Sequence, residues 1–215
     1  MTSVTTRPPC GSTDTLTPAD RTPRDAIARY RALTAAIGEP WVLRVRSTAL
    51  VVRPAGAADL HRVGALHARC SPRTLLDRYR AGGKRPSPIA LEGMVRRPLA
   101  FAVALPTGAL VGLATVGADV LHGGSAGELG VLIADDWQGM GIGRELIAHA
   151  AAAATVCGYT ELMSYPGTTL AVADQLLSEI GSTRFASDDR GLHLHTYLPE
   201  TAALGLGSVR AQLAS

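Results

Sequence analysis

Hydrophobic positions in the first half of the chain switch between the two-residue spacing of strands and the three- or four-residue spacing of helices. The run 41–53 predicts one or two strands, of which 50–53 is expected to begin the main sheet. Leu60, Val63 and Leu66 recur at helical spacing. We therefore expect helices over 57–70 and from Ser71 to about 81, strands over 99–105 and 109–116, and loops over 84–97 and 119–127.

The second half of the chain alternates strands and helices more regularly. Residues 128–133 form a short hydrophobic run, and the alanine-rich segment beyond it has high helix propensity up to Gly158. We expect a strand over 160–164, a helix over 170–180 and a last strand over 192–198. An antiparallel run followed by strand–helix–strand crossovers predicts an α+β fold with a mixed, mostly antiparallel central sheet flanked by helices.

The two ends of the chain differ from its middle. Residues 1–22 have no periodic hydrophobic pattern, and we expect a disordered leader there. Residues 23–48 predict a short helix and a strand that extend the main domain. That domain is expected to be a single one, over 49–198, followed by a C-terminal tail over 199–215.

The stretch 127–157 combines a strand, a tight turn, three alternate glycines and a helix. Such an arrangement offers backbone N–H groups and the positive end of a helix to an anion, usually a phosphate. The dinucleotide pattern G-x-G-x-x-G fails because Arg144 stands where the third glycine should be, and the P-loop pattern fails because no Lys-Ser/Thr pair follows. The sequence predicts a phosphate loop of another kind, with a glycine-rich turn that binds nothing as the alternative.

The hexapeptide Gln138-Gly139-Met140-Gly141-Ile142-Gly143 fits the pattern Q/R-x-x-G-x-G/A, and here the chain resembles the GNAT superfamily of acyl-CoA-dependent N-acyltransferases. The order of elements over 49–198 is similar too, so the resemblance implies a GNAT-like fold with acetyl-CoA as co-substrate. It implies that a bulge at Gly130 turns a backbone N–H toward the thioester. It further implies that the pyrophosphate of coenzyme A is held by Gln138, Gly139, Met140, Gly141, Ile142, Gly143 and Arg144, and the pantetheine arm by Val131, Leu132 and Ile133.

Glu128 stands at the start of the strand that leads to this loop. At about 3.3 Å per residue it lies roughly 16 Å from Ile133, too far to touch the pyrophosphate. Several GNAT enzymes carry a glutamate at this position as general base, so the resemblance implies that Glu128 removes the proton of the acceptor amine. The alternative is a glutamate that only begins the strand at the surface.

The general acid of the family is not matched. Leu177 stands where the family has a tyrosine, Ser182 replaces its phenylalanine and Leu170 its asparagine. Tyr165 and Tyr159 are candidate substitutes for the acid. Two hypotheses follow: an N-acetyltransferase that acts on a primary amine by direct attack in a ternary complex, and an acyl-CoA-binding regulatory or interaction module with little turnover.

The acceptor is less defined than the cofactor. Residues 69–79 resemble a helix pair in a bacterial GNAT subgroup that includes protein-lysine acetyltransferases. Because such helices wall the acceptor side in the family, we expect acceptor choice to depend on them and on the loop 84–97. A protein lysine, an N-terminus and a small amine all stay open as acceptors.

Composition narrows the partners and the compartment. The formal net charge of the 215 residues is +3, and the basic residues are scattered, which argues against nucleic acid. The three cysteines lack C-x-x-C spacing, and no hydrophobic run is long enough for a membrane span, so we expect a cytoplasmic protein. His193 and His195 share a strand face without an evident third ligand, so we expect no metal. A homodimer is compatible with the sequence.

Overall fold

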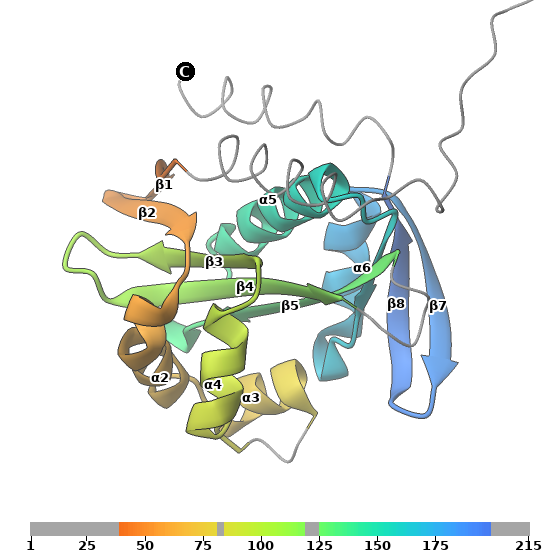
Figure 1. The fold of residues 1–215 in the computed structure, drawn as a ribbon, viewed down its shortest axis with the longest axis horizontal. Helices are drawn as coiled ribbons and strands as arrows, with labels where there is room; N and C mark the ends of the chain where they lie inside the picture. The colour runs from red at the N-terminus through yellow and green to blue at the C-terminus, as the bar shows by residue number, and fades with distance from the viewer. Residues whose placement is uncertain (1–38, 81–83, 119–124, 199–215) are drawn as a thin grey trace, which may run out of the picture.

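A computed structural model describes residues 39–80, 84–118 and 125–198, drawn in colour in Figure 1. The leader 1–22, the helix expected within 23–37, most of the loop expected over 119–127 and the tail 199–215 lie outside the described residues. Within the described part of the chain, no helix is both long and hydrophobic enough to cross a membrane.

The described residues form one eight-stranded sheet with the order β1-β2-β3-β4-β5-β6-β8-β7. Every neighbouring pair is antiparallel except β5 and β6, which run parallel. The structure therefore confirms the predicted α+β class and the mixed, mostly antiparallel sheet. The strands are β1 (Trp41–Val45), β2 (Thr48–Pro54), β3 (Leu99–Ala104), β4 (Leu110–Ala118), β5 (Ala126–Ile133), β6 (Glu161–Ser164), β7 (Ser182–Asp188) and β8 (Gly191–Tyr197).

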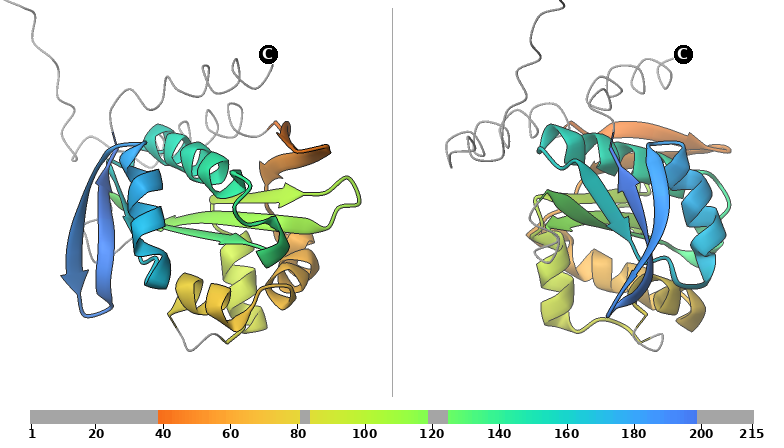
Figure 2. Two further views of the ribbon diagram at one scale, coloured as in Figure 1. Left: turned by 180° about the vertical axis from the view of Figure 1, so that it is seen from behind. Right: turned by 90° about the vertical axis from the view of Figure 1, so that its right-hand side faces the viewer.

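Helices cover both faces of the sheet (Figures 1 and 2). In the view of Figure 1, α2, α3 and α4 lie below the sheet and α5 lies above it, while α6 packs against β7, β8 and α5. Short 3₁₀ helices over 57–59, 135–137 and 167–169 precede α2, α5 and α6. The helices are α2 (Leu60–Ala68), α3 (Pro72–Tyr79), α4 (Pro88–Val95), α5 (Ile142–Val156) and α6 (Leu170–Ser178).

The core has two halves, one on each face of the sheet. On β3, Phe101 and Val103 belong to the half beneath α5, whereas Ala102 belongs to the half beneath α2 and α4. The alanines of α5 are almost all buried, because small side chains let a helix approach a sheet closely. A core with few aromatic residues is thus filled by Val, Leu and Ala, as the composition indicates.

Strands β5 and β6 separate along their length. Their parallel pairing covers only residues 126–128 of β5, and it ends where Glu128 faces Met163. On its other side β5 stays paired with β4 as far as Ile133. The edge of β5 over 129–133 is therefore not paired with β6, and the two strands diverge around an opening.

Three details of the sequence prediction are wrong. Residues 84–97 contain α4, which begins like α3 with a serine cap and a proline: the hydroxyl of Ser87 accepts from the N–H of Ala90 at 3.3 Å. Strand β7 was not predicted, because as an edge strand it is largely exposed and has no regular hydrophobic alternation. Strand β5 begins at Ala126 and runs through Gly130 in unbroken register with β4, so Gly130 is not a bulge.

Arg53 and Asp59 form a largely enclosed ion pair. Both terminal guanidinium nitrogens donate to the carboxylate at 2.7 Å, and the side chains of Asp59 and Arg53 are 4% and 26% exposed. The N–H of Gly56 also donates to Asp59 at 3.1 Å. The pair joins β2 to the start of α2 and so fixes the helix layer to the sheet.

Asp59→Asn is expected to lower the free energy of unfolding by about 2–3 kcal/mol, less than for a fully buried pair because Arg53 is a quarter exposed. Mainly because Arg53 donates to it, and despite its burial, the pKa of Asp59 lies below its usual range. This contribution is therefore present above the ordinary carboxyl pKa of about 3.9 and is lost as the pH falls through the lower folded value.

Chemical denaturation of the wild type, Asp59→Asn and Glu92→Gln at pH 7 checks this prediction. Glu92 pairs with Arg96 on the surface of α4, so its substitution is expected to cost less than about 0.5 kcal/mol. Equal effects of the two substitutions would contradict the role given to Asp59.

Candidate functional site

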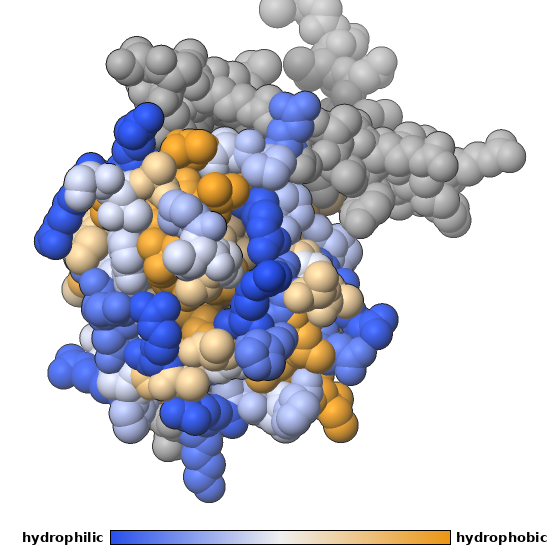
Figure 3. Space-filling model, turned by 90° about the vertical axis from the view of Figure 1, so that its left-hand side faces the viewer, coloured by the Kyte–Doolittle hydropathy of each residue, from blue (hydrophilic) through white to orange (hydrophobic). Residues whose placement is uncertain are grey.

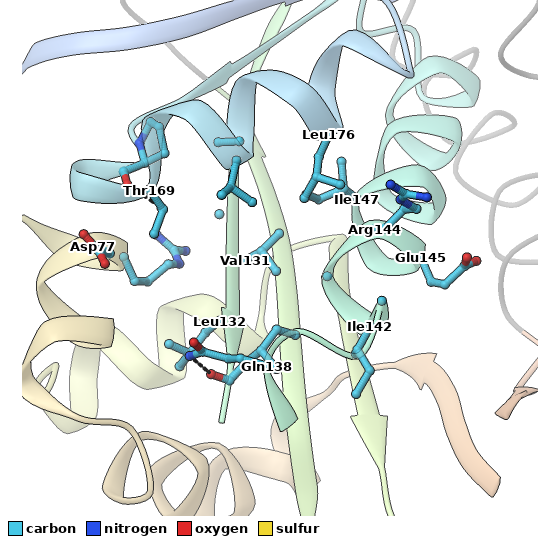
Figure 4. Close-up of a pocket in the computed structure, with 18 of the residues that line it drawn as sticks. Asp77, Val131, Leu132, Gln138, Ile142, Arg144, Glu145, Ile147, Thr169 and Leu176 are labelled. Carbon is cyan, nitrogen blue, oxygen red and sulfur yellow. Dashed lines mark hydrogen bonds between the residues drawn. The ribbon is translucent and has the colours of Figure 1, made fainter. Parts of the chain in front are cut away.

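A cavity of about 910 Å³ occupies the opening between β5 and β6. Its walls come from β5, the glycine loop, the first turns of α5, the whole length of α6, α3 and the end of β1. In Figure 4, Asp77 and Thr169 lie at one end of the cavity and Arg144 and Glu145 at the other, with Val131 between them. The cavity is thus a long channel along the unpaired edge of β5.

The outer surface near β1 and β2 has a mixed character. In the space-filling view of Figure 3, hydrophobic residues are visible between hydrophilic ones near the middle of this face. Val42 on β1 is half exposed, whereas Leu43 and Val45 of the same strand are buried and line the cavity.

The glycine loop leaves open space in front of the N-terminus of α5. Gly139 and Gly141 have φ values of 69° and 83°, which favour glycine. A β-carbon at either of them or at Gly143 would meet no other atom within 4 Å. The N–H of Glu145 donates to the carbonyl of Gly141 at 3.2 Å, so the N–H groups of residues 142–144 have no acceptor within the helix. The loop therefore has the donors, the dipole and the room for an anion.

The side chain of Gln138 holds the loop in place. Its Nε2 donates to the carbonyl of Ile133 at 3.0 Å and to the hydroxyl of Thr74 at 3.2 Å. Figure 4 shows Gln138 beside Leu132 at the end of β5. The side chain of Gln138 therefore connects the loop to β5 and α3. The predicted contact of Gln138 with a ligand would have to be made by its backbone.

The aspartates that precede the loop attach α3 to it. Asp135 accepts from the N–H of Ser71 at 3.0 Å and from the hydroxyl of Thr74 at 2.8 Å. Asp136 pairs with Arg69 through two hydrogen bonds of 2.9 and 2.8 Å. The sequence indicated only turn residues here, since nothing in the local pattern reveals a partner more than 60 positions away.

Asp135→Ala is expected to lower the free energy of unfolding by about 1 kcal/mol, because the start of α3 loses its acceptor at an exposed position. Partial burial opposes its ionisation, but the hydrogen bonds from Thr74 and Ser71 prevail and lower the pKa of Asp135. The loss should therefore be seen above the usual carboxyl pKa and vanish as the pH falls through the lowered one. Thermal unfolding of this variant beside Thr155→Ala, whose hydroxyl bonds only within α5, measures it; unfolding that keeps the full difference at low pH would contradict it.

The three predicted strand residues all line the cavity, in different ways. Val131 and Ile133 are partly buried and pack toward the core half beneath α5. The side chain of Leu132 is buried in the other half of the core, beneath α2 and α4. Leu132 can therefore serve a bound molecule mainly through its backbone. The residues predicted at the loop also line the cavity: Gln138, Gly139, Met140, Gly141, Ile142, Gly143 and Arg144.

The guanidinium group of Arg144 is paired with another side chain and does not reach into the cavity as a free cation. Its guanidinium donates to Glu179 beyond the end of α6 at 3.0 Å, and about half of each side chain is exposed. The pair links α5 to α6 at the rim of the cavity. Of the predicted loop residues, Arg144 thus has its side chain engaged elsewhere, as Gln138 does.

Glu128 lies at the opposite end of the cavity, beside a cluster of polar side chains. Its Oε2 accepts from Nη1 of Arg190 at 3.1 Å, and about a third of each side chain is exposed. Arg190 also pairs with Asp188 at 3.4 Å and stacks over the ring of Tyr165, with its Cζ 4.5 Å from the centroid. Arg190 lies in the turn between β7 and β8, Asp188 ends β7 and Tyr165 follows β6, so only the folded sheet brings them to Glu128.

The two tyrosines predicted as substitutes for the general acid differ in their position relative to the cavity. Leu177 is fully buried in the core beneath α5. Tyr165 lines the cavity, and its hydroxyl donates to Asp188 at 2.6 Å, which is the main reason that the pKa of Asp188 is lowered. Tyr159 packs against the core and is not among the residues that line the cavity.

The two histidines of β8 are engaged in structural contacts. Nε2 of His195 bonds with Glu161, and its Nδ1 lies 3.2 Å from Arg184. His193 packs against Tyr165, with ring centroids 5.0 Å apart. No group of three metal-ligating side chains is found among residues 39–80, 84–118 and 125–198.

Comparisons with known proteins agree on one family. Residues 70–173 match the family model described as acetyltransferase (GNAT) family. The matched segment runs from the end of α2 into α6 and includes the whole cavity-lining stretch of β5, the glycine loop and the start of α5. No curated protein matches the sequence.

Several solved structures share the fold. The GNAT domain of PAT from S. lividans has a TM-score of 0.65 and 17% identity, over 74% of this chain and 97% of that one. A phosphinothricin acetyltransferase from Sinorhizobium meliloti, in complex with acetyl-CoA, has a TM-score of 0.57 and 18% identity, over 70% of this chain and 89% of that one. The structure of yncA from Salmonella typhimurium, described as a putative acetyltransferase with its cofactor acetyl-CoA, has a TM-score of 0.53 and 18% identity, over 70% of this chain and 94% of that one. At such identities the likeness shows the fold, and the family model shows that the segment 70–173, just under half of the chain, is similar to the acetyltransferase (GNAT) family.

Proposed function

We propose that the protein transfers an acetyl group from acetyl-CoA to a primary amine. The observation that carries this proposal is the continuity of one channel, from the open glycine loop, along the unpaired edge of β5, to the carboxylate of Glu128. The channel offers phosphate donors at one end and a proton acceptor at the other. An extended molecule that carries a diphosphate and a thioester fits this order of groups.

The cofactor half rests on the loop and on β5. The N–H groups of residues 142–144 and the α5 dipole hold the pyrophosphate. The edge of β5 over 129–133 then offers its unpaired peptide groups to the amides of the pantetheine arm, as a neighbouring strand would. The walls over this stretch are hydrophobic side chains, including Ile147 and Leu176, which suit the aliphatic parts of the arm.

The part of the proposal that concerns the acceptor amine rests on Glu128. An ammonium group with an ordinary pKa near 10 is almost wholly protonated at pH 7 and must lose a proton before it attacks. The carboxylate of Glu128 receives this proton, directly or through a water molecule. Arg190 holds the carboxylate in place through Oε2.

The leaving group needs no strong acid. An alkyl thiol has a pKa of about 8.5, so its thiolate is a tolerable leaving group near neutral pH. Tyr165, with its hydroxyl donating to Asp188, is the one candidate tyrosine that lines the cavity. Direct attack in a ternary complex is consistent with this arrangement, because both substrates reach the same channel.

A second candidate function is an acyl-CoA-binding module without turnover. The buried Leu177 at the position of the family's tyrosine favours it. Calorimetry with coenzyme A, followed by thiol release from acetyl-CoA over a panel of amines and peptides, separates the two. Binding with turnover supports the transferase, binding without turnover on any acceptor supports the module, and the absence of binding contradicts both.

A further inference from the structure

Two arginine side chains lie over two glycines beside Glu128. Arg78 lies in the last turn of α3, and Arg97 follows the end of α4. A β-carbon at Gly130 on β5 would overlap the guanidinium of Arg78, and one at Gly117 on β4 would overlap that of Arg97. The two glycines therefore make room for the two guanidinium groups, which explains Gly130 without a bulge.

Both guanidinium groups lie close to Glu128. Gly117 is the residue that pairs directly with Glu128 across β4 and β5, so their Cα atoms are about 5 Å apart. Gly130 is two residues further along β5 and faces the same side of the sheet, about 7 Å away. Both arginines thus lie on the side of the sheet that α3 and α4 cover, as does Glu128.

Neither arginine has a carboxylate partner among the described residues. Nη2 of Arg78 donates to the hydroxyl of Thr115 at 3.2 Å, and its Cζ lies 4.8 Å from the centre of the Tyr79 ring. The backbone N–H of Arg97 donates to the carbonyl of Met94 at 3.3 Å, but its side chain forms no hydrogen bond or ion pair with any residue described. The other arginines of the neighbourhood differ: Arg96 pairs with Glu92, and Arg190 pairs with Glu128 and Asp188.

The guanidinium groups of Arg78 and Arg97 thus lie near each other in a partly enclosed place, without a carboxylate partner among the described residues. Burial lowers the pKa of Arg78, and the neighbouring charge of Arg97 acts in the same direction, against the attraction of Glu128. Nearby carboxylates are engaged by other groups: Glu128 and Asp188 pair with Arg190, and Asp77 accepts from the N–H and the hydroxyl of Thr168. A bound anion would give Arg78 and Arg97 the partner that they lack among the described residues, whereas a simple ammonium would not.

We infer that the acceptor is a small amino-carboxylate, with its amine at Glu128 and its carboxylate bound by Arg78 and Arg97. The inference rests on the proposed function, since it names the substrate class of the same site. A carboxylate is planar and can accept two parallel hydrogen bonds from one guanidinium group. It therefore matches the geometry of arginine side chains better than a compact anion without this planar pair of oxygens would. The short separations along β4 and β5 require the two groups of the acceptor to be only a few bonds apart, as in an amino acid. A lysine within a protein has no free carboxylate at that distance.

The first experiment compares acceptors in matched pairs. Thiol release from saturating acetyl-CoA is measured with the common L-amino acids and β-alanine, each beside its carboxamide, and with a lysine peptide and spermidine. At least one acid is expected to exceed its amide by 100-fold or more in kcat/KM. Equal or better turnover of the amides, the peptide or spermidine would overturn the inference while leaving the transferase function intact.

A second experiment uses variants and does not depend on turnover alone. Arg97→Gln and Arg78→Gln are each expected to raise the KM, or the calorimetric Kd, of the preferred acid at least tenfold, with the Kd of coenzyme A within twofold of wild type. Arg96→Gln, the adjacent exposed arginine paired with Glu92, is the matched control and is expected to change neither value. A drop in kcat of Arg78→Gln that is equal for acids and amides would assign Arg78 to the thioester instead and overturn the inference.

The outcomes for the two proposals are separable. If coenzyme A does not bind, the proposed function fails. If coenzyme A binds and no carboxylate in the panel is either acetylated or bound in its presence, the transferase or module hypotheses survive and the inference about the acceptor fails.

Discussion

Glu128→Gln is expected to reduce kcat by about 10²- to 10⁴-fold, the usual contribution of a general base. Glutamine keeps the size of the side chain and can still accept from Arg190, but it cannot take a proton from the amine. The affinity for coenzyme A should stay within twofold, because Glu128 lies roughly 16 Å along β5 from the end that adjoins the loop. Stopped or continuous thiol-release assays at saturating acetyl-CoA, with calorimetry for the cofactor, measure both quantities.

Two further variants make this result specific. Glu128→Asp keeps the charge but withdraws it by one methylene, and it should retain more activity than Glu128→Gln. Glu92→Gln removes a carboxylate from the exposed side of α4, outside the cavity, and should leave kcat unchanged. A Glu128→Gln enzyme with full activity would show that Glu128 only begins the strand, which is the structural alternative.

Gly143→Leu is expected to weaken coenzyme A binding at least tenfold, about 1.4 kcal/mol or more. Gly143 lies in the first turn of α5, and a β-carbon there meets no protein atom within 4 Å, so the fold has room for a larger side chain. If that room is where the pyrophosphate sits, leucine takes the place of the ligand. Stability should not fall, since leucine is a better helix former than glycine.

The matched control is Gly93→Leu. Gly93 is also a helical glycine with nothing within 4 Å of an added β-carbon, but it lies in α4, away from the cavity. It should bind coenzyme A like the wild type and gain similar stability. Thermal unfolding and calorimetry of both variants measure this, and equal, undiminished binding by Gly143→Leu would mean that the phosphates lie elsewhere.

Local patterns in the sequence predict much of the fold because the elements that carry the site are strongly marked. Gly139 and Gly141 adopt the left-handed φ values that only glycine tolerates easily, so the loop appears as glycines in the sequence itself. The alanine-rich run predicts α5 to within a few residues, and the hydrophobic face 170–180 of α6 is packed inward as its periodicity indicates. Ser87 and Pro88 carry the same start signal as Ser71 and Pro72, so α4 was detectable from its cap.

The contacts of the site are a different matter. Arg190 meets Glu128 across 62 positions, Thr74 meets Asp135 across 61, and Thr168 bonds to Asp77 across 91. Such pairs depend on the order of strands in the sheet and on which helix covers which face. The spacing of nearby residues in the sequence predicts neither of these. The edge strand β7 was not predicted for a related reason, because a strand with exposed faces has little hydrophobic alternation.

By itself the sequence therefore determined the glycine loop, the strand before it, the helix after it and the α+β class, because each depends on backbone conformation and on the period of hydrophobic residues. Only the tertiary structure decided how β5 and β6 separate to form the channel, why Gly130 and Gly117 must be glycine, and which charged groups surround Glu128. The physical reason is that steric exclusion and charge compensation act between side chains that folding brings together from distant parts of the chain.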